Sequence, residues 1–452
     1  MTEYMTAAEA ARRLGVKPAT LYAYVSRGVL NRDKAADGRG SLFDAEEVER
    51  LARRGRPRRP VGTADITVES AITEITADRL RYRGLDAVRL ATSHSFEDVA
   101  ELLWTGQLPP SRAPQSSQPS RAPQSPHVSQ PSRTFQSSRA SRSARTDGEA
   151  QAAALPASAG AGPWRATPAA LAAGRAAQAA LPAGTLPLER FQVIVPAMAA
   201  TDPLRLQLDP AAVLADGRTI IAGMVDCLPT AGAEAGDQGD LAGRLWSRLC
   251  DHRGTPALWR ALSAALVLLA DHELAASTLA ARVAASVRAD PYAVVSTGLG
   301  AMSGTLHGGA SLAVEAMLAA ASGPQDVPRV VGELLRRGER VPGFGHLVYR
   351  AGDPRGILLL DLVRRAAPKS AQLAVAEAVL AEVRQKSLPP PNSDFALATL
   401  VRVAGMTRGA GEAVFAVART AGWIAHAIEA YAGPGPLRPR AVYTGRPAVS
   451  DP

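Results

Sequence analysis

GLGAMSGTLHGGA at residues 298–310 and VPGFGHLVYRAGDPRG at residues 341–356 are the two stretches that decide the fold and chemistry of this chain. Each places one histidine, His307 or His346, among several glycines, which let backbone and ligand approach closely. Arg355 follows His346 by nine residues, and a guanidinium near a histidine suits a carboxylate-bearing ligand. Taken alone, the first stretch could also be a helix break around a structural histidine, and the second a surface turn with an Asp–Arg pair.

Four further short stretches carry ionisable groups. They are ADHELAAST at 270–278, PNSDF at 391–395, ARTAGWIAHAIE at 418–429 and RPRAVYTG at 438–445. His272 follows a long apolar run, so its surroundings could be a helix end that reaches water. Asp394 follows a proline-rich turn, where a lone aspartate is usually the N-cap of a helix.

The composition favours a helical protein. With 452 residues the chain is long enough for two or three domains. Alanine is abundant and aromatic residues make up only 4%, a balance that favours helices over strands. Two cysteines, Cys227 and Cys250, indicate no disulfide framework and fit a reducing compartment. No secretory segment is recognisable, and the longest apolar run, residues 261–270, is too short to span a membrane. We therefore expect a cytoplasmic protein without membrane contacts.

The net charge of +9 is unevenly distributed. Residues 1–60 hold 13 Lys/Arg and 8 Asp/Glu, and residues 111–146 hold six arginines and no acidic residue. Basic clusters of this kind favour polyanions such as nucleic acid, although they could also be simply solvated. The second cluster lies in a Ser/Pro/Arg/Ala-rich segment of low complexity, which predicts a disordered surface insertion over 111–164.

Residues 1–55 have the pattern of a small separate domain. Thr6 and Glu9 form a capping-box pattern at the start of a helix that ends near Leu14. A second helix begins near Pro18, a polar glycine-rich stretch over 33–40 suits a hairpin or wing, and Phe43 and Asp44 open a third helix over 45–54. Residues 56–64 form a basic linker.

This order resembles the MerR- and excisionase-like winged helix-turn-helix family, in TAAEAARRLGVKPATLYAYVSRGVL at 6–30 and LFDAEEVERLARR at 42–54. In that family the second helix enters the major groove of DNA. The residues that this helix would offer to DNA are Lys17, Thr20, Tyr22, Tyr24 and Arg27. A different interpretation of the same pattern is a helical hairpin used only for protein contacts.

The longer motifs, taken together and in order, resemble the citrate synthase family, as does YRGLDAVRLATSHSFEDVAELLWTGQLP at 82–109. The resemblance covers 65–110 and 165–446, which predicts one catalytic domain interrupted by the insertion. It implies an all-α, two-part helical body with a large and a small part, preceded by the winged helix-turn-helix domain.

The resemblance also implies an activity, that of an acyltransferase which converts the acyl group into an alkyl group on transfer. Acetyl-CoA, the co-substrate, would condense with oxaloacetate through an enol or enolate, and thioester hydrolysis would release citrate and CoA. Asp394 would be the base, His307 the donor to the thioester carbonyl, and His346 the group that binds and protonates the oxaloacetate carbonyl. His307 should act as a neutral donor.

Further site residues follow from the same resemblance. Those implied to bind the oxaloacetate carboxylates are His272, Arg355, Arg419 and Arg438. Arg438 would reach in from a neighbouring subunit, so a homodimer or higher homo-oligomer is expected. Gly343 and Gly345 would lie along CoA. No bound cofactor and no metal site are expected.

Several positions depart from the family pattern. Ala275 stands where asparagine is usual, Ser311 where asparagine follows His-Gly-Gly-Ala, and Leu347 where arginine often follows the second histidine. These changes leave room for propionyl-CoA as substrate, as in 2-methylcitrate synthases. They are also compatible with a DNA-binding transcription regulator that uses the body as a metabolite sensor, with DNA as a further partner, and with an inactive oligomeric scaffold.

Overall fold

The structure is a computed structural model with two compact units, residues 1–69 with 438–452 and residues 70–437. The residues that it describes are 4–14, 21, 25, 30–34, 41–45, 47–48, 68–109, 164–232, 239–433, 435–439, 441 and 444–445. The five residues expected to contact DNA, and the expected insertion up to residue 163, lie outside the described residues.

The N-terminal unit contains helix α1 (Ala7–Leu14) and a small antiparallel sheet of order β1-β3-β2. Its strands are β1 (Tyr4–Thr6), β2 (Asp33–Lys34) and β3 (Ser41–Asp44). The expected capping box is present, because Glu9 accepts the backbone N–H of Thr6 at 2.9 Å and Thr6 Oγ1 accepts that of Glu9 at 3.4 Å. The pairing of β2 with β3 gives the expected hairpin, and Phe43 packs in the core with Ala10 and Ala11.

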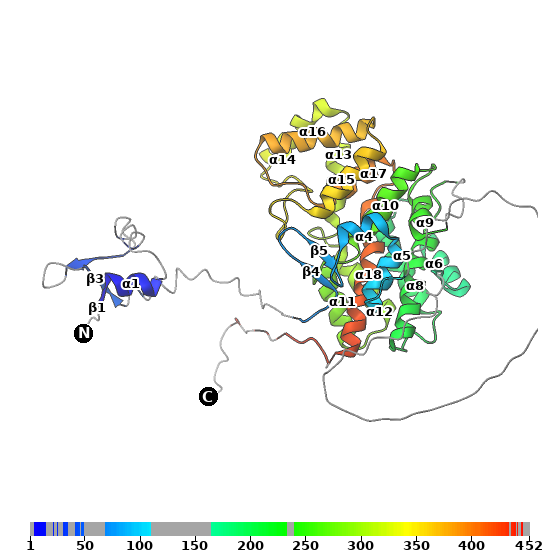
Figure 1. The fold of residues 1–452 in the computed structure, drawn as a ribbon, viewed down its shortest axis with the longest axis horizontal. Coiled ribbons are helices and arrows are strands. Elements are labelled where there is room, and N and C mark those ends of the chain that lie inside the picture. Colours follow the sequence, from blue (N-terminus) through cyan, green and yellow to red (C-terminus); the bar gives the residue numbers. More distant parts are fainter. Residues whose placement is uncertain are drawn as a thin grey trace, which may run out of the picture. The chain divides into compact units, whose positions relative to one another are not determined.

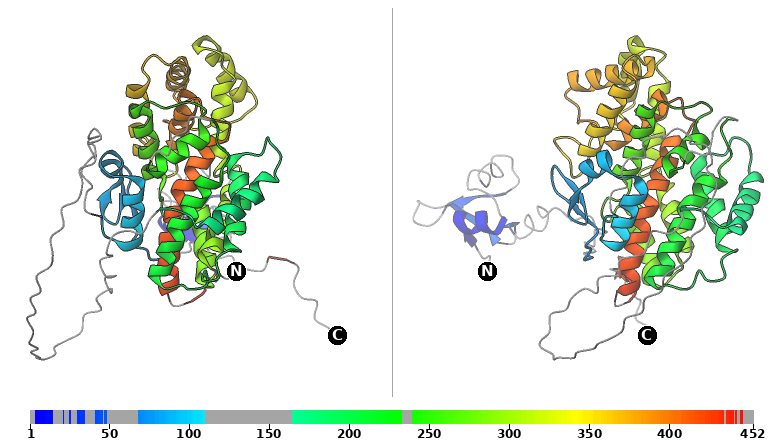
Figure 2. Two further views of the ribbon diagram at one scale, coloured as in Figure 1. Left: turned by 90° about the vertical axis from the view of Figure 1, so that its right-hand side faces the viewer. Right: turned by 45° about the vertical axis from the view of Figure 1, so that its right-hand side comes forward.

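The larger unit is predominantly helical and has two lobes (Figure 1, Figure 2). The large lobe begins with three short strands, β4 (Thr73–Ile75), β5 (Leu80–Tyr82) and β6 (Leu85–Asp86). Its helices are α4 (Ala87–Ser93), α5 (Phe96–Thr105), α6 (Pro168–Ala179), α7 (Pro187–Ala199), α8 (Pro210–Cys227), α9 (Leu241–Leu249), α10 (Pro256–Leu269), α11 (Ala276–Ser286), α12 (Pro291–Met302) and α18 (Ala410–Ala432). The small lobe contains α13 (Gly309–Ala319), the 3₁₀ helix η1 (Pro324–Asp326), α14 (Val327–Arg336), α15 (Pro354–Ala366), α16 (Ala371–Gln385) and α17 (Ser393–Val403).

Many of these helices start with the same local signal. A Thr or Asp side chain accepts a backbone N–H of the first turn, and proline occupies the first helical position, where its missing N–H costs nothing. The pairs are Thr167–Pro168, Asp209–Pro210, Thr255–Pro256, Asp290–Pro291 and Asp353–Pro354. These helix starts are therefore set by neighbouring residues in the sequence.

Helix α18 is the centre of the larger unit. All of its residues from Ala410 to Ala427 are buried, and it packs against helices of both lobes, including α5, α8, α10, α11, α12 and α17. Figure 1 shows it running through the large lobe. The turns that follow α10 and α12 and the start of α17 lie around it, and these segments carry most of the expected site residues.

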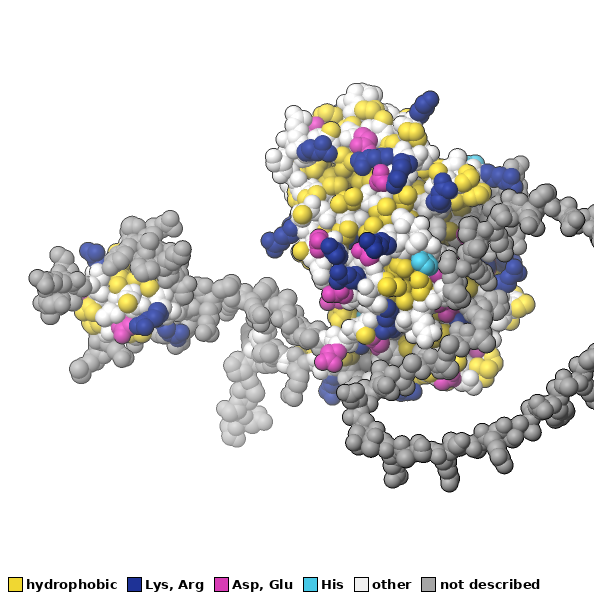
Figure 3. All heavy atoms as spheres, in the orientation of Figure 1, with side chains coloured by type: hydrophobic (Ala, Val, Ile, Leu, Met, Phe, Trp, Pro, Cys, Tyr) yellow, Lys and Arg dark blue, Asp and Glu magenta, His cyan; other side chains and the backbone are white. Residues whose placement is uncertain are grey.

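The surface mixes charge and apolar character. In Figure 3, Lys and Arg side chains stand among hydrophobic ones over the small lobe. Among the described residues, no helix has both the length and the apolar character that crossing a membrane would need.

Candidate active site

His272 lies in the turn after α10, where it meets residues of the other lobe. Its Nε2 is 3.2 Å from Tyr349 Oη, and its ring centroid is 5.3 Å from that of His346. Tyr349 is fully buried and stacks on His346, with ring centroids 4.7 Å apart. Burial, together with the positive charges of Arg355 and Arg419, holds the pKa of His272 well below its usual value, so its ring is neutral. Of the triplet that could have been a helix end reaching water, only Glu273 is exposed; His272 is partly buried and Asp271 is fully buried.

The backbone fixes which nitrogen of His346 carries the proton. Nδ1 accepts the backbone N–H groups of Val348 at 3.1 Å and Tyr349 at 3.3 Å. An accepting nitrogen carries no proton, so the neutral ring is protonated on Nε2. Burial and the nearby Arg355 lower the pKa of His346, which favours this neutral form. Nε2 lies 3.5 Å from Arg355 Nη2, and two donors this close are arranged to share one acceptor, such as a carboxylate or carbonyl oxygen.

Arg355 is held by a buried ion pair. Its Nε and Nη2 donate to Oδ1 and Oδ2 of Asp353 at 3.0 and 2.8 Å. Asp353 is the N-cap of α15, and it also accepts the backbone N–H of Ser393 at 3.0 Å. The Asp–Arg pair exists, but the surface-turn interpretation is wrong, because Asp353 and Arg355 are only 1% and 4% exposed. The guanidinium is thus oriented before any ligand arrives.

Two facing turns connect the loop of His346 with the start of α17. Asn392 donates its backbone N–H to Gly343 O at 2.9 Å and its side-chain amide to Gly345 O at 3.1 Å. Gly343 and Gly345 have φ of +82° and +86°, a left-handed conformation that favours glycine. At Gly343 a β-carbon would also come within 2.9 Å of Phe395 Cβ. The glycine loop therefore has its shape set by backbone conformation and close packing.

Asp394 stands in the first turn of α17. The N-cap of this helix is Asn392, which accepts the backbone N–H groups of Asp394 and Phe395 at 3.0 and 3.3 Å, so the N-cap interpretation of Asp394 is wrong. Within the described part of the chain, no hydrogen bond or ion pair holds the Asp394 carboxylate. Burial raises the pKa of Asp394 to about 6, against the attraction of Arg355. An unengaged carboxylate with a raised pKa is suited to accept a proton.

Ser277 sets the tautomer of His307, which lies in the turn between α12 and α13. His307 Nε2 is 2.7 Å from Ser277 Oγ, and Trp423 Nε1 donates to the same oxygen at 3.3 Å. The hydroxyl accepts the indole N–H, and among the described residues His307 Nε2 is the one acceptor within reach of its own proton, so the Ser277 proton points to His307 Nε2. The neutral ring then carries its own proton on Nδ1. Burial, and to a smaller extent Arg419, lower the pKa of His307 to about 4, so this ring is a neutral donor near pH 7.

Arg419 is a buried arginine in the middle of α18. The residue is 1% exposed, and its Nε donates to Leu269 O at 3.0 Å. Its guanidinium carbon lies 4.7 Å from the ring centroid of Phe415, which in turn contacts the His307 ring. Nη1 is buried and has no hydrogen-bond partner in the part of the chain that the structure describes. Since a buried donor without a partner is costly, this nitrogen is suited to an anionic ligand.

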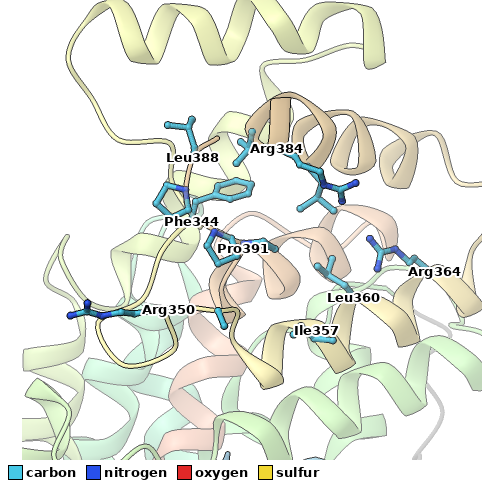
Figure 4. A pocket seen from close by; sticks show the side chains of 13 residues that line it. Phe344, Arg350, Ile357, Leu360, Arg364, Arg384, Leu388 and Pro391 are labelled. Carbon is cyan, nitrogen blue, oxygen red and sulfur yellow. The ribbon is translucent and has the colours of Figure 1, made fainter. Parts of the chain in front are cut away.

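A pocket of about 430 Å³ adjoins the facing turns, because Phe344 and Pro391 both line it (Figure 4). The backbones of these two residues pair, and the Phe344 ring centroid lies 4.9 Å from that of Phe395, next to Asp394. Most of the wall is apolar. Three arginines also line the pocket: Arg350, Arg364 and Arg384. Such a lining suits a ligand that combines apolar and anionic parts.

Comparison with known proteins identifies the family to which this chain belongs. A family model described as the citrate synthase C-terminal domain matches residues 62–440. The chain belongs to the citrate synthase family. A helix-turn-helix domain model matches residues 4–56. Both resemblances seen in the motifs are thereby confirmed.

Curated citrate synthases match the chain over part of their length. Citrate synthase 2 of Bacillus subtilis (strain 168) is 36% identical over 198 residues, which are 42% of this chain and 52% of that protein. The citrate synthase of Haloferax volcanii is 40% identical over 185 residues, 40% of this chain and 49% of that protein. The chain thus spans about half the length of the curated relatives that it matches.

Solved citrate synthases share the fold. The crystal structure of citrate synthase from Thermotoga maritima MSB8 superimposes with a TM-score of 0.60 at 22% identity, covering 87% of this chain and 97% of that one. The citrate synthase of Thermoplasma acidophilum, solved as a ternary complex with carboxymethyl coenzyme A and oxaloacetate, gives a TM-score of 0.63 at 21% identity and covers 85% and 96%. The expected helical, two-part citrate synthase body is therefore confirmed.

One expected residue of this citrate synthase family member is not placed at the site. Arg438 is exposed and belongs to the other compact unit, so its role stays a prediction. Among the described residues, no group of three or more His, Cys, Asp or Glu side chains could hold a metal ion.

The sequence motifs also missed residues that the site uses. These are Ser277, Tyr349, Asn392, Phe415 and Trp423. Ser277 and Tyr349 had a usable signal, because each stands in a motif shortly after a site histidine. The contacts of Phe415 and Trp423 come from α18 and depend on tertiary packing.

Proposed function

We propose that this citrate synthase family member condenses acetyl-CoA with oxaloacetate and hydrolyses the resulting thioester to citrate and CoA. The observation that carries the proposal is the set of protonation states at the site. His307 and His346 are neutral rings, each with its proton on a defined nitrogen, while Asp394 is a carboxylate with no partner among the described residues and a pKa raised to about 6. These are the states that carbon-acid chemistry needs: two donors for developing oxyanions and one base.

The steps balance with these three groups. Asp394 takes a proton from the methyl group of the thioester while His307 donates from Nδ1 to the thioester carbonyl oxygen. The enolate carbon then attacks the ketone carbon of oxaloacetate, whose oxygen takes the proton from His346 Nε2. Before the next turnover Asp394 gives up the methyl proton and His346 regains one, so both groups return to their starting states. Water hydrolyses the thioester and releases CoA. Placement of the reacting atoms between preset donors supplies much of the rate enhancement in such sites.

Two preset guanidinium groups support a dicarboxylate as the second substrate. Arg419 has a buried Nη1 without a partner among the described residues, and Arg355 Nη2 lies beside His346 Nε2. His272 adds a neutral ring beside His346. Arginine binds carboxylates with strong, charge-assisted hydrogen bonds. Each of the two carboxylates of oxaloacetate would therefore bind one guanidinium group.

We assign the CoA part of the thioester to the glycine loop and the neighbouring pocket. Gly343 and Gly345 give the loop its left-handed turns beside the pocket, and the pocket offers apolar walls with Arg350, Arg364 and Arg384 (Figure 4). Arginines at an apolar pocket suit the phosphates and the pantetheine chain of CoA. Phe344 links this pocket to the start of α17 through its contact with Phe395.

The test is CoA release by the purified full chain, followed with a thiol-reactive dye, from acetyl-CoA with and without oxaloacetate. We expect release that depends on oxaloacetate, and Asp394→Ala should abolish it while oxaloacetate still binds. Preference for propionyl-CoA would change the assignment to a 2-methylcitrate synthase. Absence of release from either thioester, with oxaloacetate still bound, would overturn the enzyme proposal and favour a ligand sensor.

A second function is favoured by the helix-turn-helix match over residues 4–56. We propose that this unit binds DNA through Lys17, Thr20, Tyr22, Tyr24 and Arg27, which lie outside the described residues. A gel-shift titration of the full chain on mixed genomic fragments should show salt-sensitive binding. Lys17→Ala with Arg27→Ala should weaken it, and binding unaffected by this double change would contradict the assignment.

A further inference from the structure

Asp271 is a fully buried carboxylate that the mechanism above does not use. Its Oδ2 accepts the hydroxyl of Thr73 at 2.6 Å and the backbone N–H of Glu273 at 3.1 Å. The second bond closes a turn around His272, the residue between Asp271 and Glu273. Glu273 has φ of +55°, a conformation that a residue with a side chain adopts only at a cost. The Asp271 carboxylate thus holds the backbone conformation that presents His272.

The same carboxylate faces α18 on its other side. A β-carbon at Gly422 would come within 2.3 Å of Asp271 Oδ1, so only glycine lets the helix approach this closely. Gly422 also donates its backbone N–H to Ala270 O at 3.1 Å. Arg419, one turn earlier on α18, has its charge close enough to help lower the pKa of Asp271; His426 lowers it more, and both act against burial, which raises it. Arg419 also donates its Nε to Leu269 O at 3.0 Å, so the segment 269–271 that ends in Asp271 contacts two of the expected substrate ligands, His272 and Arg419.

A chain of polar groups lies behind Asp271, and its last link, from His426 to Asp271, is a contact at ion-pair range that does not meet hydrogen-bond geometry. His426 is 1% exposed, and its Nε2 lies 3.5 Å from Asp271 Oδ1. Arg282 Nη1 donates to His426 Nδ1 at 2.8 Å and to Glu429 Oε2 at 2.8 Å. Since arginine can only donate, His426 Nδ1 carries no proton, and the neutral ring has its proton on Nε2, toward Asp271. Buried networks of this kind set the orientation of the groups that they contact.

We propose that Asp271, with His426 behind it, is a positioning residue for the oxoacid: it fixes the turn that presents His272 and, through the close contact of residues 269–271 with α18, keeps Arg419 in place for a substrate carboxylate. This inference rests on the proposed function, because it assigns His272 and Arg419 to that substrate. Asp271 touches neither substrate itself. Its effect should therefore fall on the binding of one substrate and spare the chemistry at His307 and Asp394.

The decisive variant is Asp271→Asn, which keeps the size of the side chain and one accepting oxygen but removes the charge. We expect the KM for oxaloacetate, and its Kd by calorimetry, to rise at least about tenfold, the scale of comparable supporting contacts. The Kd for acetyl-CoA should stay within about twofold, and kcat should fall much less than KM rises. His426→Gln should give a smaller change in the same direction.

The matched control is Glu101→Gln. Glu101 is equally part of a buried charge pair, with Arg218 at 2.6 and 2.9 Å, but its carboxylate engages none of the expected site residues. A loss of Tm in both variants with a rise in oxaloacetate KM only in Asp271→Asn supports the inference. If Asp271→Asn binds oxaloacetate as well as the wild type does, or if Glu101→Gln raises KM equally, the inference is wrong while the proposed function stands. Wild-type protein that neither binds nor turns over oxaloacetate would overturn both.

Discussion

Ser277 Oγ lies 2.7 Å from His307 Nε2 and accepts from Trp423 Nε1; with no other acceptor for its proton among the described residues, the hydroxyl donates to His307 Nε2. The hydroxyl thus decides that the proton of the neutral imidazole is on Nδ1. Three residues from three different helices or turns are needed for this outcome, and none of them could set it alone.

Ser277→Ala should lower kcat by about tenfold or more, the effect of roughly 1.4 kcal/mol in the barrier, because His307 then loses the partner that selects its donor tautomer. The KM for oxaloacetate should change little, since the Ser277 hydroxyl meets His307 and Trp423 and none of the arginines that would bind this substrate. Steady-state kinetics with acetyl-CoA would measure both. Ser303→Ala is the control, because the Ser303 hydroxyl is exposed and donates to Gly300 O; an equal loss in the control would contradict the role of Ser277.

The fall of kcat/KM at acidic pH should follow the protonation of Asp394. The base works only when ionised, so with a pKa of about 6 kcat/KM should fall about tenfold per pH unit below that value. His307, with its pKa lowered to about 4, stays neutral across this range. A profile measured from pH 4.5 to 8.5 that shows no transition between pH 5 and 7 would contradict the assignment of the base.

Asp394→Asn should make the protein inactive but more stable at neutral pH. Burial raises the pKa of Asp394 from 3.8 to about 6, so above pH 6 the folded state carries a charge that it disfavours relative to the unfolded state. Removing that charge should raise the free energy of unfolding at pH 8 by about 3 kcal/mol, and the gain should vanish below about pH 3.8. Urea unfolding at both pH values checks this. Asp361→Asn, at an exposed ion pair with Arg365, should change stability little at either pH.

Tyr349→Phe should raise the KM for oxaloacetate about fivefold, the effect of one lost hydrogen bond of about 1 kcal/mol. The variant removes the hydroxyl that meets His272 Nε2 at 3.2 Å but keeps the ring that stacks on His346. Burial raises the pKa of Tyr349 to about 12, so the hydroxyl is protonated at every working pH. The rise in KM should therefore be the same at pH 7 and pH 8.5; a rise confined to one pH would point to a different cause.

Gly343→Ala should destabilise the protein by about 1–3 kcal/mol and abolish turnover, because the position combines φ of +82° with contacts of 2.8 Å to Val314 and 2.9 Å to Phe395 for any β-carbon. Relief of these contacts would displace the turn before His346. Thermal unfolding and CoA release would measure the two effects. Gly332→Ala in α14 meets nothing within 4 Å and should leave Tm equal or slightly higher. A destabilised Gly332→Ala would indicate that glycine replacement is harmful for another reason.

Features controlled by neighbouring residues could be read from the amino-acid sequence. Helix starts such as Thr255–Pro256 and Asp290–Pro291 follow from capping and from the fixed φ of proline. The whole set of motifs in order, including the two glycine-rich histidine motifs, indicated the family, and the match over residues 62–440 confirmed it. The burial of the Asp353–Arg355 pair and the capping of α17 by Asn392 were not predicted, because neighbouring residues alone do not reveal what packs over them.

The chemical state of the site depends on tertiary structure. The tautomer of His307 is set by Ser277 and Trp423, which lie 30 residues before and 116 residues after it in the sequence. The pKa of Asp394 is raised by burial, and Arg419 Nη1 is buried without a partner in the part of the chain that the structure describes. A motif gives the residue types, but burial and the direction of each hydrogen bond depend on segments that the fold brings together, and these set which groups donate and which accept protons.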